Sequence, residues 1–303
     1  MTKKVTLIMP AFNVGEFIES AIQSIIDQTF SDWLLIIIND GSTDNTWEVI
    51  STFTDSRIKA FNFNGNKGPG WASSYALKMI DTPYVGRMDA DDLSEPDRLE
   101  KQIAYMEKNK DVSAVRTYAH FFSNDQELRK SDFYKMKKNI SEPLRNEVLT
   151  RQQLSEKMYW YLCFVSPTAL MRTDAVKAIG YSSSFRLGED YHLFYNLNKN
   201  NYIIDTLPET LYHYRIVKGS ATHRHIKSHS EVNYQIKKIE IGNLFIKHQV
   251  YIWGTGSVAQ ELTSLLEEDG HHISGYLDFN LNADTPLSPR FDFKQLDPAL
   301  HKV

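Results

Sequence analysis

Short apolar runs alternate with segments of helical periodicity from residue 5 to residue 88, and this alternation restricts the fold more than any other feature. The runs that predict buried strands are Val5–Met9, Trp33–Ile38, Ile58–Phe63 and Tyr84–Met88. The segments that predict helices are Glu16–Gln28, Asp44–Phe53 and a stretch from Gly68 to about Ile80. Strands joined through helices form a parallel sheet covered on both faces, so we predict an α/β fold.

Polar residues follow three of these predicted strands, at the points where the strands end. They are Pro10-Ala11-Phe12-Asn13, Asn39-Asp40-Gly41 and the acidic run Arg87-Met88-Asp89-Ala90-Asp91-Asp92. In parallel sheets, ligands bind beyond the carboxyl ends of the strands. We therefore expect the three groups to converge on one crevice.

The acidic run places three carboxylates within four residues, at Asp89, Asp91 and Asp92. Carboxylates this close repel one another unless a cation neutralises them. A hard divalent ion, Mn²⁺ or Mg²⁺, suits such oxygen ligands and could stabilise a diphosphate leaving group. A solvated acidic turn that caps a helix near Glu95 is the structural alternative. Convergence with the other two polar groups favours a ligand site.

Composition limits the remaining classes of protein. At roughly 150 residues per domain, 303 residues predict about two domains. A net charge of −4 argues against general nucleic-acid binding, so no nucleic-acid partner is expected. A single cysteine, Cys163, excludes an internal disulfide and fits a reducing compartment. Because no apolar stretch approaches the ~20 residues that cross a bilayer, we expect a cytoplasmic protein, with peripheral contact at the inner face of the cytoplasmic membrane left open.

Taken in order, the motifs of the chain resemble a family-two glycosyltransferase of the GT-A fold over roughly residues 4 to 220. Each motif alone is a weak signal, whereas all five in order are a strong one. The motifs are Pro10-Ala11-Phe12-Asn13, Asn39-Asp40-Gly41-Ser42-Thr43-Asp44, Asn66-Lys67-Gly68, Asp89-Ala90-Asp91-Asp92 and Gly188-Glu189-Asp190. The resemblance implies a Rossmann-like mixed sheet flanked by helices.

The resemblance also implies a role for each motif. Asp91 would be the direct metal ligand, and Asp89 would contact the ribose or the metal. Asp190, with Glu189 as second choice, would be the base that takes the acceptor's proton. Asp40 would accept the N–H of a uracil ring, and Arg215 would contact the diphosphate. The implied nucleotide-sugar site comprises Pro10, Ala11, Phe12, Asn13, Asp40, Lys67, Asp89, Ala90 and Arg215.

The chain departs from the family pattern in the third helix. Ala72-Ser73-Ser74 stands where the family usually has Ala-Arg-Asn, and Trp71 precedes it. The Gln-x-x-Arg-Trp motif of processive synthases is absent, which favours an enzyme that adds one sugar. The basic run 129–138 could meet an anionic acceptor or a membrane surface, although a solvated charged face is the simpler interpretation.

A second unit is predicted after residue 248. Val250–Trp253 reads as a strand, Gly254–Ala259 as a glycine turn, and Ile273–Leu277 as a second strand ending at Asp278. This small C-terminal β-α-β unit resembles a partial Rossmann half, and truncation would explain its short length. We predict a glycosyltransferase domain over 1–222, a helical linker over 223–248 and the partial unit over 249–303.

The resulting hypothesis is an inverting glycosyltransferase that uses Mn²⁺ or Mg²⁺. It would move a sugar from a nucleotide sugar, a UDP-sugar first, to a hydroxyl of a glycan or glycolipid, as in surface polysaccharide assembly. A nucleotidyltransferase is one alternative, although Ala11-Phe12-Asn13 replaces its usual glycine- and arginine-rich loop. A non-catalytic nucleotide-sugar-binding protein is the other. A homo-oligomer is left open.

Overall fold

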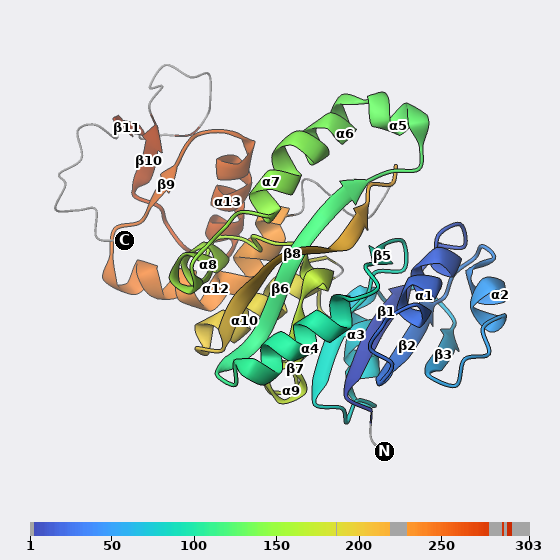
Figure 1. Ribbon diagram of the computed structural model, residues 1–303. Helices are drawn as coiled ribbons and strands as arrows, with labels where there is room; N and C mark the ends of the chain where they lie inside the picture. Colours follow the sequence, from blue (N-terminus) through green and yellow to red (C-terminus); the bar gives the residue numbers. More distant parts are fainter. Residues whose placement is uncertain (1–2, 186, 219–228, 279–286, 288–289, 293–303) are drawn as a thin grey trace. The chain divides into compact units, whose positions relative to one another are not determined.

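The computed structural model describes residues 3–185, 187–218, 229–278, 287 and 290–292 (Figure 1). The chain divides into two compact units, Met1–Arg224 and His225–Val303, and each is described by itself. Among the described residues, none of the helices combines the length and apolar character that crossing a membrane requires.

The first unit is built on an eight-stranded mixed sheet with the strand order β3-β2-β1-β4-β7-β6-β8-β5. Strands β3, β2, β1 and β4 are parallel, and β7 pairs antiparallel with both β4 and β6. This arrangement confirms the predicted α/β class with a mixed sheet flanked by helices. The strands are β1 (Val5–Ala11), β2 (Trp33–Asp40), β3 (Ile58–Phe63), β4 (Tyr84–Arg87), β5 (Leu93–Ser94), β6 (Val112–Phe122), β7 (Leu170–Arg172) and β8 (Ile203–Arg215).

Both faces of this sheet are covered by helices and their apolar side chains. Alternate residues of β1 enter different cores: Leu7 and Met9 pack in one cluster, and Ile8 packs in the other. This is the pattern of a strand buried on both faces. The helices are α1 (Ile18–Ile26), α2 (Thr46–Ser51), α3 (Pro69–Leu77), α4 (Arg98–Lys108), α9 (Thr173–Ile179) and α10 (Glu189–Lys199).

The polar stretch between β6 and β7 forms a series of short helices, and Figure 1 shows the first of them, α5 to α7, above the end of β6. The chain here passes through one π-helical turn, Lys137–Ser141. The other helices are α5 (Gln126–Lys130), α6 (Asp132–Met136), α7 (Glu142–Arg145) and α8 (Arg151–Met158), with a 3₁₀ turn at Ser166–Thr168.

The second unit contains a three-stranded parallel sheet, β11-β10-β9. The predicted strand, glycine turn, helix and strand appear as β9 (Tyr251–Trp253), α13 (Ser257–Glu268) and β10 (Gly275–Asp278), and β11 (Arg290–Asp292) adds a further strand. The predicted linker is described only from residue 229, where it forms α12 (His229–Lys247). Tyr234 of α12 packs with Ile252 and Leu266 in the core, so α12 is part of this unit.

Gly70 lets α3 approach the segment that leads into α10. A Cβ at this position would lie 2.2 Å from the carbonyl oxygen of Ser182 and 3.0 Å from Cβ of Glu189. Backbone atoms cannot yield as a flexible side chain can, so only glycine fits this contact. The approach holds the first turn of α10 against α3.

We expect Gly70→Ala to destabilise the first unit. An alanine inside a helix normally stabilises by about 0.5–1 kcal/mol relative to glycine, but overpacking costs about 1–3 kcal/mol. The midpoint of urea-induced unfolding, followed by tryptophan fluorescence, should therefore fall. Ser74→Ala in the same helix is the control and should leave the midpoint unchanged or raise it. A stability of Gly70→Ala equal to that of the natural protein would contradict the close contact.

Candidate active site

The loop after β1 is held against the loop after β2. Asn13 adopts a φ of 52°, and its Oδ1 accepts a hydrogen bond from the backbone N–H of Thr43 (2.8 Å). The backbone N–H of Asn13 donates to Oγ of Ser42 (3.0 Å). Ala11 is buried at the end of β1, whereas the Phe12 ring is 37 % exposed. The motif Pro10-Ala11-Phe12-Asn13 thus presents an aromatic ring at the edge of the sheet.

Asp40 lies at the end of β2, next to β1, and is almost fully buried. Its Oδ2 accepts hydrogen bonds from the backbone N–H groups of Lys67 (2.9 Å) and Gly68 (2.6 Å). Its Oδ1 is buried and has no hydrogen-bond partner among the residues that the structure describes. A buried carboxylate oxygen left in this state costs free energy unless a ligand satisfies it.

Lys67 binds Asp40 through its backbone, while its side chain is turned to an aromatic cluster. The ammonium lies 4.2 Å from the centroid of the Trp71 ring, and this ring stacks on Tyr75 at 5.6 Å. Trp71 is half-buried, so it forms part of the packing around α3. The cation of Lys67 is exposed and engages Trp71 by a cation–π contact.

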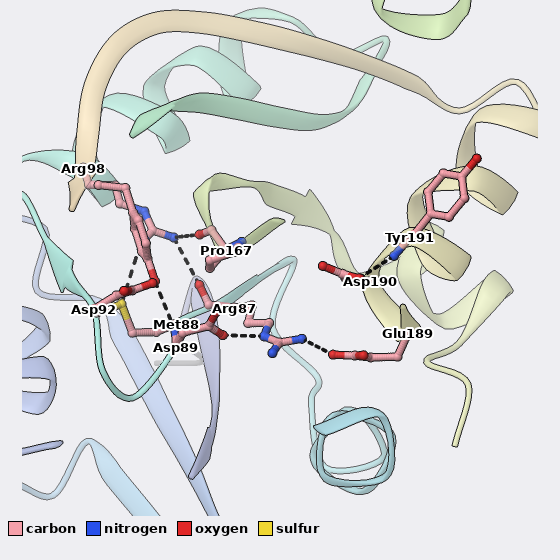
Figure 2. A network of polar contacts seen from close by, with 10 residues as sticks. Arg87, Met88, Asp89, Asp92, Arg98, Pro167, Glu189, Asp190 and Tyr191 are labelled. Atoms are coloured by element: carbon pink, nitrogen blue, oxygen red, sulfur yellow. Dashed lines mark hydrogen bonds and ion pairs between the residues drawn. The ribbon is translucent and has the colours of Figure 1, made fainter. Parts of the chain in front are cut away.

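Arg87, at the end of β4, connects the acidic loop to the start of α10 (Figure 2). Its Nε donates to Oδ1 of Asp89 (2.7 Å), and its Nη1 donates to Oε1 of Glu189 (2.6 Å). Burial opposes the charge of this guanidinium, but the two carboxylates outweigh it and raise the pKa of Arg87. Two of the predicted site residues, far apart in sequence, therefore share one cation.

Glu189 and Asp190 begin α10 after Gly188, whose φ of 85° makes the turn. Burial raises the pKa of Glu189 to about 6, against the charge of Arg87, which favours the carboxylate. Asp190 is half-buried, and its Oδ1 accepts the backbone N–H of Tyr191 (2.7 Å). The two carboxylates thus differ: Glu189 is held in an ion pair and Asp190 is not part of one in the described chain.

Asp92 anchors the acidic loop to strand β8. Its Oδ2 accepts a hydrogen bond from the Tyr212 hydroxyl (2.8 Å), and its Oδ1 accepts the backbone N–H of Arg215 (2.7 Å). Burial, together with the charges of Asp91 and Asp89, raises the pKa of Asp92 well above its usual range. The hydrogen bonds tie the loop to β8.

Arg98 is a site residue that the sequence did not single out. It is fully buried at the start of α4 and donates to the carbonyl oxygens of Pro167 (2.7 Å) and Arg87 (3.3 Å). Its guanidinium lies 4.9 Å from the centroid of the Tyr212 ring, and Figure 2 shows it beside Asp92. The sequence did contain a signal for Arg98: this arginine lies on the apolar face of the helix that follows the acidic run.

Arg215 contacts the backbone of Asp91, the residue that we expect to bind the metal. Its Nε donates to the carbonyl oxygen of Asp91 (2.5 Å), and its guanidinium lies between the rings of Phe17 (5.0 Å) and Phe122 (4.6 Å). Arg215 also borders a pocket of about 210 Å³. The expected contact of Arg215 with a diphosphate stays a prediction.

Asp91 is the remaining carboxylate of the acidic loop. Burial and the neighbouring charge of Asp89 raise its pKa to about 6. Within the described part of the chain, no three His, Cys, Asp or Glu side chains gather closely enough to hold a metal ion by themselves. A hard cation is commonly bound by one or two carboxylates together with the phosphates of its substrate. The residues present fit that incomplete kind of site.

Known proteins resemble this chain in sequence and in fold. A glucosyltransferase of Escherichia coli, UDP-Glc:alpha-D-GlcNAc-diphosphoundecaprenol beta-1,3-glucosyltransferase WfaP, is 28% identical over 243 residues, which are 78% of this chain and 87% of that protein. TarS of S. aureus, solved with UDP-GlcNAc, has the same fold at a TM-score of 0.64 and 18% identity, over 87% of this chain and 71% of that one.

A second solved structure shares the fold less closely. The mannosyltransferase PcManGT of Pyrobaculum calidifontis, in complex with GDP-Man and Mn²⁺, matches with a TM-score of 0.57 and 18% identity, over 80% of this chain and 65% of that one.

The family model described as "Glycosyl transferase family 2" matches residues 6–180, more than half of the chain. This match spans the loops after β1, β2 and β4, so it includes the acidic run and most of the residues that the motifs predicted. The resemblance inferred from the motifs is confirmed. The chain therefore belongs to glycosyl transferase family 2 and is a glycosyltransferase.

Proposed function

We propose that this glycosyltransferase moves a sugar from a UDP-sugar to a hydroxyl of a glycan or glycolipid, with inversion at the anomeric carbon. The observation that carries the proposal is the contact of Arg87 with both Asp89 and Glu189. The contact supports a single reaction centre, because it joins the acidic loop to the carboxylate pair that begins α10.

The donor nucleotide is assigned to uridine through Asp40 and Phe12. Oδ1 of Asp40 is buried and unsatisfied in the described chain, and a uracil N–H is a donor that would satisfy it. Phe12, 37 % exposed beside Ala11, offers a ring face for the base. The names of the relatives support this choice, since the WfaP enzyme uses UDP-Glc and TarS was solved with UDP-GlcNAc.

A divalent cation, Mn²⁺ or Mg²⁺, would be held by Asp91, with Asp89 beside it. When bound together with the donor's diphosphate oxygens, it supplies positive charge to the departing diphosphate. Asp89 accepts from Arg87, which limits its freedom to act as the principal ligand. Arg215, through the Asp91 carbonyl, fixes the backbone from which the Asp91 carboxylate extends.

Asp190 is proposed as the base. It removes the proton of the acceptor hydroxyl while that oxygen forms a bond to the anomeric carbon and the bond to the diphosphate breaks. Glu189 is the poorer candidate because Arg87 holds it in an ion pair at 2.6 Å. Glu189 would instead position α10 relative to the acidic loop.

The acceptor is proposed to be a sugar of a glycan or a glycolipid, as in surface polysaccharide assembly at the cytoplasmic side of a membrane. The buried Tyr191 of α10 holds the chain that carries two exposed aromatic rings, because its hydroxyl donates to the carbonyl oxygens of Met158 and Tyr159 (3.2 Å each). The rings of Tyr159 and Trp160 are 44 % and 67 % exposed, and exposed rings of this kind stack well on sugars.

The two carboxylates of α10 can be separated by isosteric substitutions. We expect Asp190→Asn to lower kcat by about 10²–10⁴-fold, which is the contribution of a general base. Glu189→Gln should retain measurable transfer, because its amide still accepts from Arg87. Transfer from UDP-Glc and UDP-GlcNAc would be measured with Mn²⁺ present, and UDP binding should persist in both variants. Full activity of Asp190→Asn would remove Asp190 from the mechanism.

The metal assignment predicts that Asp91→Asn uncouples UDP binding from Mn²⁺. Loss of an outer-shell partner already costs about 10–100-fold in metal affinity, so loss of the carboxylate itself should cost at least as much. Isothermal titration of UDP with and without Mn²⁺ would measure the coupling. Asp81→Asn, at an exposed position, is the control and should behave as the natural protein does. Unchanged Mn²⁺ dependence in Asp91→Asn would exclude this ligand.

The uridine assignment predicts a change of base preference in Asp40→Asn. The amide oxygen can replace Oδ2 toward Lys67 and Gly68, which leaves an N–H₂ group where Oδ1 was. This group repels the uracil N–H but can donate to N3 of cytosine. We expect UDP affinity to fall by about 10–100-fold, the value of a hydrogen bond to a charged group, and CDP to gain relative to UDP. A preserved UDP preference would contradict the role of Asp40.

A further inference from the structure

The helical segment 132–145, which comprises α6, the π turn and α7, is held to the protein by polar contacts and by Phe133 and Tyr134, which pack against the core. Oε2 of Glu142 accepts the backbone N–H of Phe121 (3.1 Å) in β6. The side chain of Asn146, just beyond the segment, bonds both the N–H (2.9 Å) and the carbonyl oxygen (2.7 Å) of Ala119. Glu142 also pairs with Lys138 (2.6 Å). The segment therefore docks on the uncovered edge of β6 through hydrogen bonds.

The opposite side of the same segment is apolar and exposed. Met136, Ile140 and Leu144 recur at every fourth residue, with exposures of 39 %, 56 % and 54 %, and Val148 continues the spacing at 82 %. A helix on the surface of a globular protein normally buries such a stripe and exposes its polar side. Here Phe133 and Tyr134 of the same segment pack against the core, whereas the stripe stays exposed. An exposed apolar stripe of this kind marks an interaction surface.

Basic residues accompany the stripe. Residues 129–145 contain six Lys or Arg and two Asp or Glu, whereas the whole chain has a net charge of −4. The side chains of Lys130 and Lys135 are 73 % and 58 % exposed, and the ion pairs that they form within the described part of the chain are local ones, with Glu127 and Asp132. Exposed apolar side chains with basic residues nearby suit the surface of an anionic bilayer. The apolar side chains enter the boundary between headgroups and acyl chains, and the cations contact the anionic headgroups.

We propose that the face formed by Met136, Ile140, Leu144 and Val148, with Lys130 and Lys135, binds the surface of an anionic lipid bilayer. The inference deepens the proposed function and rests on it in one respect: a lipid-linked acceptor would meet the enzyme at that surface. Binding to the bilayer itself requires neither donor nor acceptor. The test can therefore succeed or fail independently of sugar transfer.

The full chain is tested by co-sedimentation with vesicles of phosphatidylcholine alone and with about 30% phosphatidylglycerol. The natural protein should pellet with the anionic vesicles and be released as salt is raised, because screening weakens the basic contribution. The double variant Ile140→Gln, Leu144→Gln should bind about tenfold more weakly or worse, since both apolar side chains leave the interface. Met79→Gln, at a residue 39 % exposed outside the segment, is the matched control.

The double variant must keep its UDP-induced thermal stabilisation, which shows that the first unit is folded. Lys130→Glu with Lys135→Glu should lose binding to anionic vesicles and gain none to neutral ones. The proposal would be overturned if the Gln variant bound anionic vesicles as well as the natural protein does, or if the natural protein failed to pellet with them. A concentration-dependent dimer that the Gln variant abolishes would also overturn it, because the apolar face would then bind a second copy of this chain. Vesicle binding without sugar transfer from any donor would reject the proposed function alone.

Discussion

The geometry of the site depends on the neutralisation of one buried cation. Arg87 lies at the end of a central strand, where an uncompensated guanidinium would cost several kcal/mol. It contacts Asp89 and Glu189 at once, so the acidic loop after β4 and the start of α10 are held at a fixed separation. Gly70 lets α3 and α10 approach closely enough for this contact. The distance between the acidic loop, where we propose the donor to bind, and the start of α10, where we propose the base, is thus set by this ion pair.

The same need for partners divides the acidic loop into supporting and available carboxylates. Asp92 is satisfied by Tyr212 and by the backbone of Arg215, with Arg98 supplying charge nearby. Asp89 is engaged by Arg87. For Asp91, no hydrogen bond to another side chain is found in the described chain, and burial raises its pKa to about 6. A carboxylate held by its backbone and left open at its oxygens is suited to an incoming cation.

The edge of β6 explains why polar side chains of the segment 132–145 face the sheet. Beyond the short pairing with β7, this edge presents N–H and C=O groups that require partners. Glu142 and Asn146 supply them, while Phe133 and Tyr134 pack against the core and Met136, Ile140 and Leu144 stay exposed. From the sequence, the basic run 129–138 was interpreted as a solvated charged face, since the helices here are short and a π turn interrupts their periodicity.

The sequence by itself determined the four parallel strands, because β1 and β2 are largely apolar runs that are buried and β3, although only partly buried, keeps Ile58, Phe61 and Phe63. It also determined the family, because motifs at successive strand ends stay in order however the chain packs. Only the tertiary structure decided the roles within each motif. Among the described residues, Glu189 pairs with Arg87, Asp92 braces the loop, Lys67 lies on Trp71 and Arg98 belongs to the site. All of these except the contact of Lys67 join residues distant in the chain. Local periodicity cannot encode such contacts, since charge pairing is settled by which side chains the folded sheet brings within hydrogen-bond distance.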